Sequence, residues 1–386
     1  AFDYWEQCYI ADGSPGKSWW ALPVSAKMPY GVEIPKFDTF TPKRARPTSG
    51  TEFVSSSHFP DEWQGAFMIC NSIGFLGVSV ATVEDDGAGY KGELVADLIS
   101  SSDKNFRPVD LEFAPDGSLY LVDWHNTLIG HMQHNARDPN RDHDHGRIYR
   151  ITHKTRPLVK PTQVAGASVP QLLENLKVLE YRTRYRTRRE LRGHSASVVI
   201  PAVKKWVSAL DRNDPNYEHH LCEALWATWA QREVDLEILQ KCLHARSFEA
   251  RAAAVSVLRF AFYAIPNSES LFLQAAHDTH PRVRLEAIVG ASWMDNAAGA
   301  RIALEALRYP FDQWTGPVTQ AILRQTLADD VQVLLARKKN PYLIEKNDRA
   351  RQFLAGDLDL AKGLESEADK RYGPTTTLSK SHREEY

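Results

Sequence analysis

Histidine and aspartate side chains are concentrated in one short stretch of the chain. Residues 125–145 carry five of the fourteen histidines together with three aspartates. Carboxylate and backbone oxygens are the ligands that Ca²⁺ prefers, whereas several imidazoles suit Zn²⁺, Cu²⁺ or Fe²⁺. No spacing here matches a defined metal motif, so a structural network of ion pairs and direct catalytic work are alternatives to a metal site. The candidate metal ligands are His131, His134, Asp138, Asp142, His143 and His145.

The sequence on either side of this stretch predicts two β-strands. Residues 113–118 predict a turn, because Pro115 presets φ and Gly117 accepts a positive φ. Residues 119–124 and 147–152 are rich in β-branched and aromatic residues, which favours strands. A strand, a tight turn, a strand and a return strand are typical of one blade of a β-propeller. A blade hairpin needs only a few residues, whereas residues 125–145 form a 21-residue excursion between two strands. We therefore expect this excursion to carry functional residues.

The end of the strand before the excursion holds a second set of candidates. Asp123, Trp124 and His125 stand where blade residues reach the mouth of a propeller's central channel. Trp124 is either a platform on which a sugar stacks or a side chain that fills the space between blades. These three residues and Arg107 are the candidate cofactor-binding residues.

The whole chain predicts a multidomain β plus α protein. Residues 1–155 predict about three blades of a partial β-propeller, and propellers close with about four to eight, so we expect the remaining blades upstream or in another chain. Residues 156–165 predict a Pro-punctuated linker. Residues 166–345 predict HEAT-like helical repeats, because amphipathic segments recur about every 30–35 residues. Residues 346–386 predict a charged helix and a disordered tail.

Three segments carry a resemblance to a known family. They are RPTSGTEFVSSSHFPDEWQG (46–65), NFRPVDLEFAPDGSLYLVDWHN (105–126) and RDPNRDHDHGRIYRIT (137–152). The chain resembles, over most of residues 1–340, the large secreted proteins of planctomycetes and verrucomicrobia that are often described as membrane-bound dehydrogenases. The resemblance implies a propeller similar to the quinoprotein sugar dehydrogenases, joined to HEAT-like repeats. Many members of that family end in a c-type cytochrome.

The resemblance also implies a cofactor, pyrroloquinoline quinone. Similar dehydrogenases hold its carboxylates with an Arg-x-Arg-Asp pattern, because arginine binds carboxylates through two hydrogen bonds. Here Asn105 replaces the first arginine, Arg107 matches the second, and the lysine expected earlier is replaced by Asn71-Ser-Ile-Gly. Arg107 is therefore expected either to hold the quinone or to pair with Asp110 or Asp123. The chain has no Cys-x-x-Cys-His motif, so covalent c-type haem attachment within it is excluded.

Composition narrows the possible partners. The 47 basic and 49 acidic side chains give no reason to expect nucleic acid or an anionic membrane, and no apolar run suggests a membrane span. The arginine-rich run 181–192 predicts docking of the first repeat or pairing with acidic neighbours, with polyanion binding as the alternative. Cys222 and Cys242 predict two buried thiols, with a disulfide as the alternative. Because the chain starts at Ala1 within blade-like sequence, we expect a processed or excised segment.

Two functional hypotheses remain. The first is a periplasmic or secreted quinoprotein-like dehydrogenase of sugars or polyols. It would use a quinone and Ca²⁺ or a transition metal, and would pass electrons to a cytochrome c domain or subunit outside this chain. The second is a non-catalytic scaffold whose propeller and repeats bind a polysaccharide or a protein.

Overall fold

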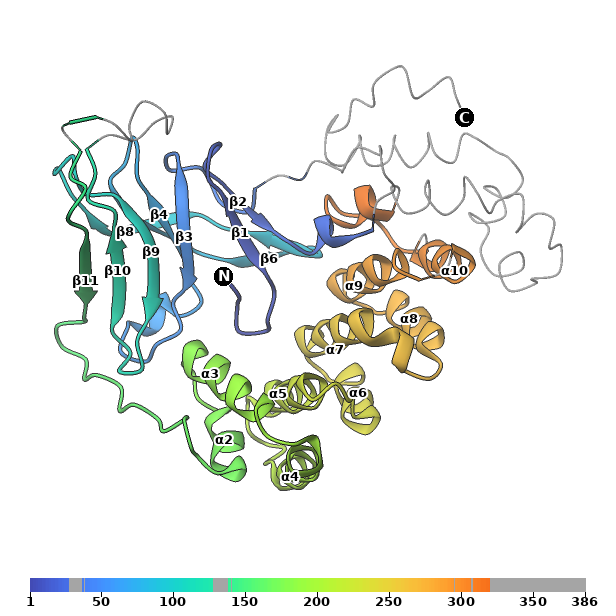
Figure 1. The fold of residues 1–386 in the computed structure, drawn as a ribbon. Helices are drawn as coiled ribbons and strands as arrows, with labels where there is room; N and C mark the ends of the chain where they lie inside the picture. Colours follow the sequence, from blue (N-terminus) through green and yellow to red (C-terminus); the bar gives the residue numbers. More distant parts are fainter. Residues whose placement is uncertain are drawn as a thin grey trace, which may run out of the picture. The chain divides into compact units, whose positions relative to one another are not determined.

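The chain contains antiparallel β-sheets followed by α-helices, so the expected mixture of β and α structure is confirmed (Figure 1). The computed structural model describes residues 1–27, 37, 39–127, 138–139, 141–294, 296–306 and 308–319. The chain divides into two compact units. The first unit holds residues 1–21, 39–86 and 90–246, and the second holds 22–38, 87–89 and 247–386.

The β-strands of the first unit form successive antiparallel sheets. Strands β1 (Tyr9–Asp12) and β2 (Lys17–Trp20) form a pair. A four-stranded sheet has the order β3 (Thr48–Phe53), β4 (Phe67–Asn71), β5 (Gly77–Ala81) and β8 (Leu94–Ser100). The short 3₁₀ helix η2 (Asp61–Trp63) lies between β3 and β4, and the short strands β6 (Glu84–Asp86) and β7 (Gly89–Lys91) lie between β5 and β8. A three-stranded sheet follows, with β10 (Leu119–Asp123) between β9 (Pro108–Phe113) and β11 (Arg147–Ile151).

The strands expected around the excursion are confirmed as β10 and β11, and the turn before them is also present. Gly117 has a φ of 79°, and its N–H donates to the carbonyl oxygen of Ala114 at 2.9 Å. The positive φ explains why glycine occupies this corner. The 21-residue excursion therefore connects two neighbouring strands of one sheet.

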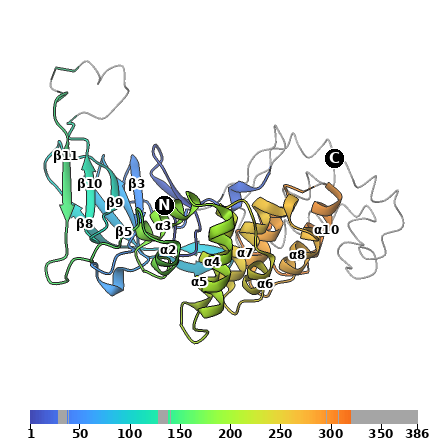
Figure 2. The same cartoon turned by 60° about the horizontal axis from the view of Figure 1, so that its bottom comes forward.

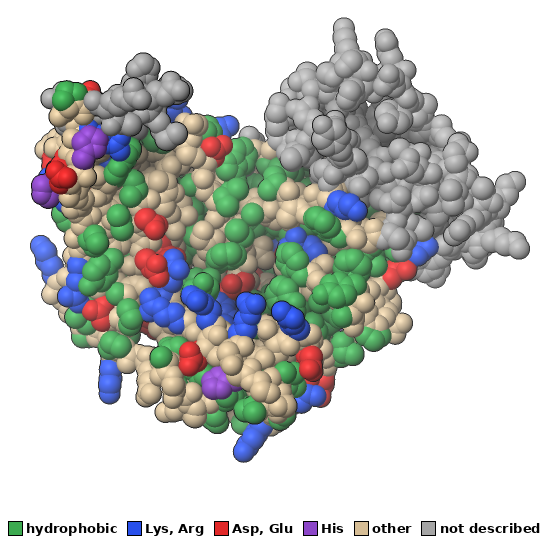
Figure 3. All heavy atoms as spheres, viewed as in Figure 1, with side chains coloured by type: hydrophobic (Ala, Val, Ile, Leu, Met, Phe, Trp, Pro, Cys, Tyr) green, Lys and Arg blue, Asp and Glu red, His purple; other side chains and the backbone are tan. Residues whose placement is uncertain are grey.

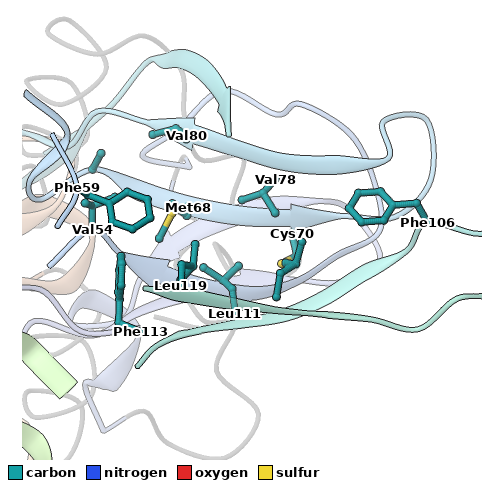
Figure 4. Close-up of a cluster of buried hydrophobic side chains, with 12 residues drawn as sticks. Val54, Phe59, Met68, Cys70, Val78, Val80, Phe106, Leu111, Phe113 and Leu119 are labelled. Atoms are coloured by element: carbon teal, nitrogen blue, oxygen red, sulfur yellow. The ribbon is translucent and has the colours of Figure 1, made fainter. Parts of the chain in front are cut away.

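A hydrophobic core lies between the four-stranded and three-stranded sheets (Figure 4). In β10, Leu119 and Leu121 are fully buried, whereas Tyr120 and Val122 are 40% exposed, as the two-residue period of a strand requires. Figure 2 shows the strands of the three-stranded sheet side by side. Fully burying one such side chain contributes about 1.5–3 kcal/mol, so a register shift of one residue in β10 is strongly disfavoured. The buried partners on the other sheet include Met68, Cys70, Val78 and Val80.

Strands β3 and β9, which belong to different sheets, approach each other closely. A Cβ atom placed on Gly50 of β3 would lie 2.5 Å from the Cα atom of Asp110 in β9. The hydroxyl of Ser49 donates to the carbonyl oxygen of Pro108 at 3.2 Å. Only glycine fits where two backbones come this close.

The helices of the first unit dock on its sheets through the arginine-rich run. These helices are α2 (Val169–Asn175), α3 (Tyr181–Arg192), α4 (Ala196–Ala209), α5 (Tyr217–Ala230) and α6 (Leu236–Leu243). The Nε atom of Arg182 lies 2.8 Å from Oε2 of Glu52, a buried residue of β3. Arg184 and Arg188 contact the buried Glu223 of α5, at 3.0 and 3.2 Å. The pairing of this run with acidic neighbours is therefore confirmed, and the contact of Arg182 with Glu52 joins α3 to β3.

The described part of the second unit is made mainly of packed helices. They are the 3₁₀ helix η1 (Pro23–Ser25), α7 (Phe248–Ala261), the 3₁₀ helix η3 (Phe262–Ala264), α8 (Ser268–Ala276), α9 (Pro281–Ala291) and α10 (Asn296–Ala306). Helix α9 packs against α7, α8 and α10. Gly290 of α9 lies directly against the ring of Phe272, where a Cβ atom would come within 2.4 Å of Cε1.

Two smaller expectations can be compared with the structure. Cys222 and Cys242 are buried thiols that are not joined in a disulfide, as predicted. Across the described ranges, every helix is too short or too polar to cross a lipid bilayer. Residues 346–386, for which we expected a charged helix and a tail, lie outside the described residues.

Candidate functional site

Asp123, the last residue of β10, is a buried carboxylate. Within the described part of the chain, one of its oxygens accepts hydrogen bonds and the other accepts none. Its Oδ1 atom accepts the backbone N–H groups of Arg107 at 2.7 Å and His125 at 2.8 Å. Its Oδ2 atom is buried and accepts no hydrogen bond from the described residues. The Nη1 atom of Arg147 lies 4.0 Å from that oxygen. Burying an unsatisfied polar oxygen destabilises a fold, so Oδ2 is a candidate contact atom for a ligand.

His125 has a strained backbone and a nearly buried ring. Its φ is 50°, in the left-handed region, where a residue other than glycine costs about 1–3 kcal/mol. The side chain is 13% exposed, and Nε2 lies 3.4 Å from Nη2 of Arg147. A guanidinium only donates hydrogen bonds, so this contact requires Nε2 to accept, whereas the Asp142 carboxylate, 3.6 Å from the same nitrogen, only accepts and requires Nε2–H; the ring proton can therefore lie on either nitrogen. Nδ1 is buried and has no hydrogen-bond partner in the described part of the chain.

Asp142 organises the return end of the excursion. Its Oδ1 atom accepts the N–H groups of Asp144 at 3.0 Å and His145 at 3.1 Å, and its Oδ2 lies 3.0 Å from Nδ1 of His145. These hydrogen bonds, with that from Asp144 foremost, lower the pKa of Asp142. The same Oδ2 atom is 3.6 Å from Nε2 of His125, so both ends of the excursion meet here.

Arg147, the first residue of β11, is a member of this cluster that the sequence interpretation missed. Its Nη1 atom lies 3.0 Å from Oδ2 of Asp103 and 3.4 Å from the hydroxyl of Tyr149. The N–H of Asn105 and the Arg147 guanidinium lower the pKa of Asp103. Arg147 is directly opposite Asp123 in the β10–β11 register, so the hairpin pairing was a signal that could have identified it.

Arg107 holds the backbone of the site. Its guanidinium donates to three carbonyl oxygens, those of Ser72 at 2.6 Å, Asn126 at 2.9 Å and Thr127 at 3.0 Å. Burial lowers its pKa. Its contact with Asp123 is made by the backbone N–H and not by the guanidinium. Arg107 thereby fixes the start of the excursion to the segment that follows β4.

The remaining candidates are distributed around this cluster. Trp124 is 41% exposed, and the guanidinium of Arg141 lies 5.2 Å from its ring centroid. His143 is exposed and Asp138 is half-buried. Histidine and acidic side chains are visible together on the surface at the ends of β10 and β11 (Figure 3). His131 and His134 lie outside the described residues.

The structure thus brings Asp123, His125, Asp142, His145 and Arg147 together. Among the residues that the structure describes, no group of three or more His, Cys, Asp or Glu side chains has the arrangement needed to hold a metal ion. Two buried polar atoms of the cluster have no hydrogen bond among the described residues, Oδ2 of Asp123 and Nδ1 of His125. A hydroxyl group both donates and accepts, so it can pair with the carboxylate oxygen and with the ring nitrogen in either tautomer.

One family model matches the chain. Its description is a domain of unknown function, DUF7133, and it matches residues 22–155, a range that includes β3 to β11 and the whole cluster. No curated protein and no solved structure matches the chain.

Proposed function

We propose that the β-sheets are blades of a propeller whose other blades are supplied outside this chain. Two observations support this. The four-stranded sheet runs in chain order from β3 to β8, and the next sheet repeats that order from β9 to β11. Their first strands, β3 and β9, lie against each other at Gly50, as inner strands do around a propeller axis.

We also propose that the helices form a HEAT-like solenoid. The support is a hydrogen bond that recurs in corresponding helices. In α3, Arg184 donates to the carbonyl oxygens five and six residues before it, at 2.7 and 2.9 Å. In α9, Arg284 makes the same two bonds at 3.0 and 2.7 Å. Each arginine is the fourth residue of its helix, which is typical of repeats of one structural unit.

The function that the geometry supports best is binding of a polyhydroxylated, carbohydrate-type ligand at the ends of β10 and β11. The observation that supports this proposal is a pair of buried atoms that have no hydrogen-bond partner among the described residues, Oδ2 of Asp123 and Nδ1 of His125. The half-exposed Trp124 between them in sequence offers an aromatic face to the apolar side of a sugar ring. The strained His125 backbone fits this role, since strain of this kind concentrates at functional sites.

A panel of neutral monosaccharides and polyols, screened by saturation-transfer difference NMR, tests this proposal. The parent chain should give signals with at least one ligand, and Trp124→Ala should lose them. Tyr120→Ala removes an equally exposed aromatic side chain from β10, the strand that ends just before Trp124, and should keep them. If the parent gives no signal with any member, or Trp124→Ala binds like the parent, the unsatisfied pair holds only structural water and the proposal is wrong.

Oxidation of the bound polyol is the second candidate function, favoured by the family resemblance. The Arg107 guanidinium does not fit the role expected for it towards a quinone, because it already donates to three carbonyl oxygens. A quinone would have to be held elsewhere, and no step of a redox reaction follows from these residues.

The redox and metal proposals have their own tests. Dye-linked oxidation of sugars by the chain incubated with pyrroloquinoline quinone tests the former, and a rate equal to that of the quinone alone would reject it. Elemental mass spectrometry before and after chelator dialysis tests Ca²⁺ or a transition metal in the 125–145 excursion. About one equivalent, lost together with thermal stability, is the expected result for a bound ion. A periplasmic or secreted location and electron transfer to a cytochrome remain parts of the same proposal.

A further inference from the structure

Two aromatic side chains occupy corresponding positions near the ends of α7 and α9 in the second unit, Phe260 in the last turn of α7 and Trp293 two residues beyond the last residue of α9. Phe260 and Trp293 each lie twelve residues after the first residue of α7 and α9, respectively. Both helices begin with a side-chain cap, from Ser247 and from His280, so the positions are equivalent. Trp229 has the same position in the sequence of α5. Because α7 and α9 pack side by side, this position repeats along the row of helices in the unit.

Both side chains face solvent to a large extent. Phe260 is 54% exposed and Trp293 is 48% exposed. Val24, which precedes Ser25 in η1, is 40% exposed. Large aromatic groups kept half in water at a repeated position are typical of a surface used for binding.

The two rings are held in place by a shared polar segment. The indole Nε1–H of Trp293 donates to the carbonyl oxygen of Ser25 at 3.0 Å. The guanidinium of Arg259 lies 4.4 Å from the ring centroid of Phe260, and its Nη1 donates to the hydroxyl of Ser25 at 2.7 Å. Arg259 is in turn 3.4 Å from the buried carboxylate of Glu286. Because these contacts already fix the side chains, little conformational entropy remains to be lost when a ligand binds.

We propose that Phe260 and Trp293 form a binding strip for a linear, neutral polysaccharide, with one sugar ring stacked on each aromatic ring. The strip is not a continuous apolar groove, because the Ser25 backbone and hydroxyl and the Arg259 guanidinium lie between the rings. A sugar ring, with apolar C–H faces and a rim of hydroxyls, matches that alternation. Packed helices lie about 8–10 Å apart, so the two platforms suit a polymer with a regular repeat better than a single sugar. The strip is separate from the β10–β11 cluster and does not depend on the function proposed there.

Affinity electrophoresis tests the inference. Native gels would contain hydroxyethyl cellulose or galactomannan as soluble neutral polysaccharides. The parent chain should be retarded by at least one of them, and Trp293→Ala and Phe260→Ala should each weaken the dissociation constant about fivefold to tenfold. Trp293→Phe keeps an aromatic face and should retain most of the retardation. Thermal melts of both alanine variants should stay close to the parent, since the side chains are half exposed.

Two control variants make the result specific. Tyr263→Ala removes a side chain that is 82% exposed but lies outside the repeated position, and it should migrate like the parent. Trp124→Ala, run in the same gels, shows whether the β10–β11 site contributes to the retardation. Loss of retardation in Trp124→Ala but not in Trp293→Ala would assign polysaccharide binding to that site and would overturn the inference. If neither polysaccharide retards the chain, or Tyr263→Ala weakens retardation as much as Trp293→Ala, the inference is wrong. A change of oligomeric state in Trp293→Ala with unchanged retardation would also overturn it and mark the strip as a protein interface.

Discussion

Replacing Asp123 by asparagine and by alanine should have very different effects on stability. Both buried N–H groups that bind this side chain, those of Arg107 and His125, donate to Oδ1. The carbonyl oxygen of an asparagine can accept both, whereas alanine leaves both without an acceptor. One unsatisfied buried N–H costs about 1–3 kcal/mol, so Asp123→Ala should lower the free energy of unfolding by about 2–4 kcal/mol.

The asparagine variant should stay within about 1 kcal/mol of the parent. It loses the attraction of Arg147, but that guanidinium is 4.0 Å away, 37% exposed and already bound to Asp103, so the loss is small. It also removes a buried charged oxygen that has no hydrogen bond among the described residues, which offsets the loss. Asp123→Asn should nevertheless lose the ligand, because an amide nitrogen cannot accept a hydroxyl proton.

Urea unfolding followed by near-ultraviolet circular dichroism measures the difference, with Asp103→Asn as a control for the Arg147 contact. Because the chain has two compact units, the three variants should be compared on the same transition. In a melt, each 1 kcal/mol corresponds to about 2–4 °C for units of this size. Equal destabilisation by Asp123→Asn and Asp123→Ala would refute the reasoning, since it would show that Oδ2 has an indispensable structural partner.

Three further predictions concern the frame around the site. Gly50→Ala should destabilise the first unit by about 1–3 kcal/mol because its Cβ meets backbone, whereas Gly13→Ala, with its nearest contact at 3.5 Å, should be tolerated in the same thermal melt. Arg182→Ala should cost about 3–5 kcal/mol at neutral pH by leaving the buried Glu52 carboxylate unpaired. Burial raises the pKa of Glu52 and Arg182 lowers it, so the variant should raise it further. A carboxyl group whose pKa is higher in the folded than in the unfolded protein lowers the free energy of unfolding as pH rises through the folded pKa. The free energies of unfolding of Arg182→Ala and the parent, measured in urea, should therefore converge towards and below pH 4.5, and a constant difference between them would contradict this. The ring of His58 forms two hydrogen bonds with backbone atoms of the segment after β11, at 2.8 and 2.9 Å. His58→Ala should remove both and speed proteolysis between residues 153 and 165; an unchanged cleavage rate would show that these bonds do not hold the segment in place.

The sequence allowed the local elements to be predicted, because their signals are local. The strand β10, predicted from its β-branched and aromatic residues, the glycine turn before it and the recurring helical segments, which include α3, α5, α7 and α9, all appear as expected. The docking of the arginine-rich run could also be inferred, since a chain with balanced charge favours ion pairing over polyanion binding.

The precise contacts of the candidate site could not be predicted, because they join residues distant in sequence. Arg107 was expected to bind a carboxylate or a quinone, yet its guanidinium binds carbonyl oxygens that include Ser72, 35 positions away. The pairing of Asp103 with Arg147 spans 44 positions and has no sequence signal of its own. The backbone strain at His125 likewise could not be predicted, because a histidine in the sequence does not by itself indicate a positive φ.

The central claim is that a polyhydroxylated ligand binds at the ends of β10 and β11. Hydrogen exchange monitored by mass spectrometry, with and without a saturating sugar from the NMR panel, tests this claim most directly. We predict slower exchange confined to residues 103–127 and 138–149 in the parent, and no such change in Asp123→Asn. Protection that is absent from these residues, or that persists unchanged in Asp123→Asn, would contradict it.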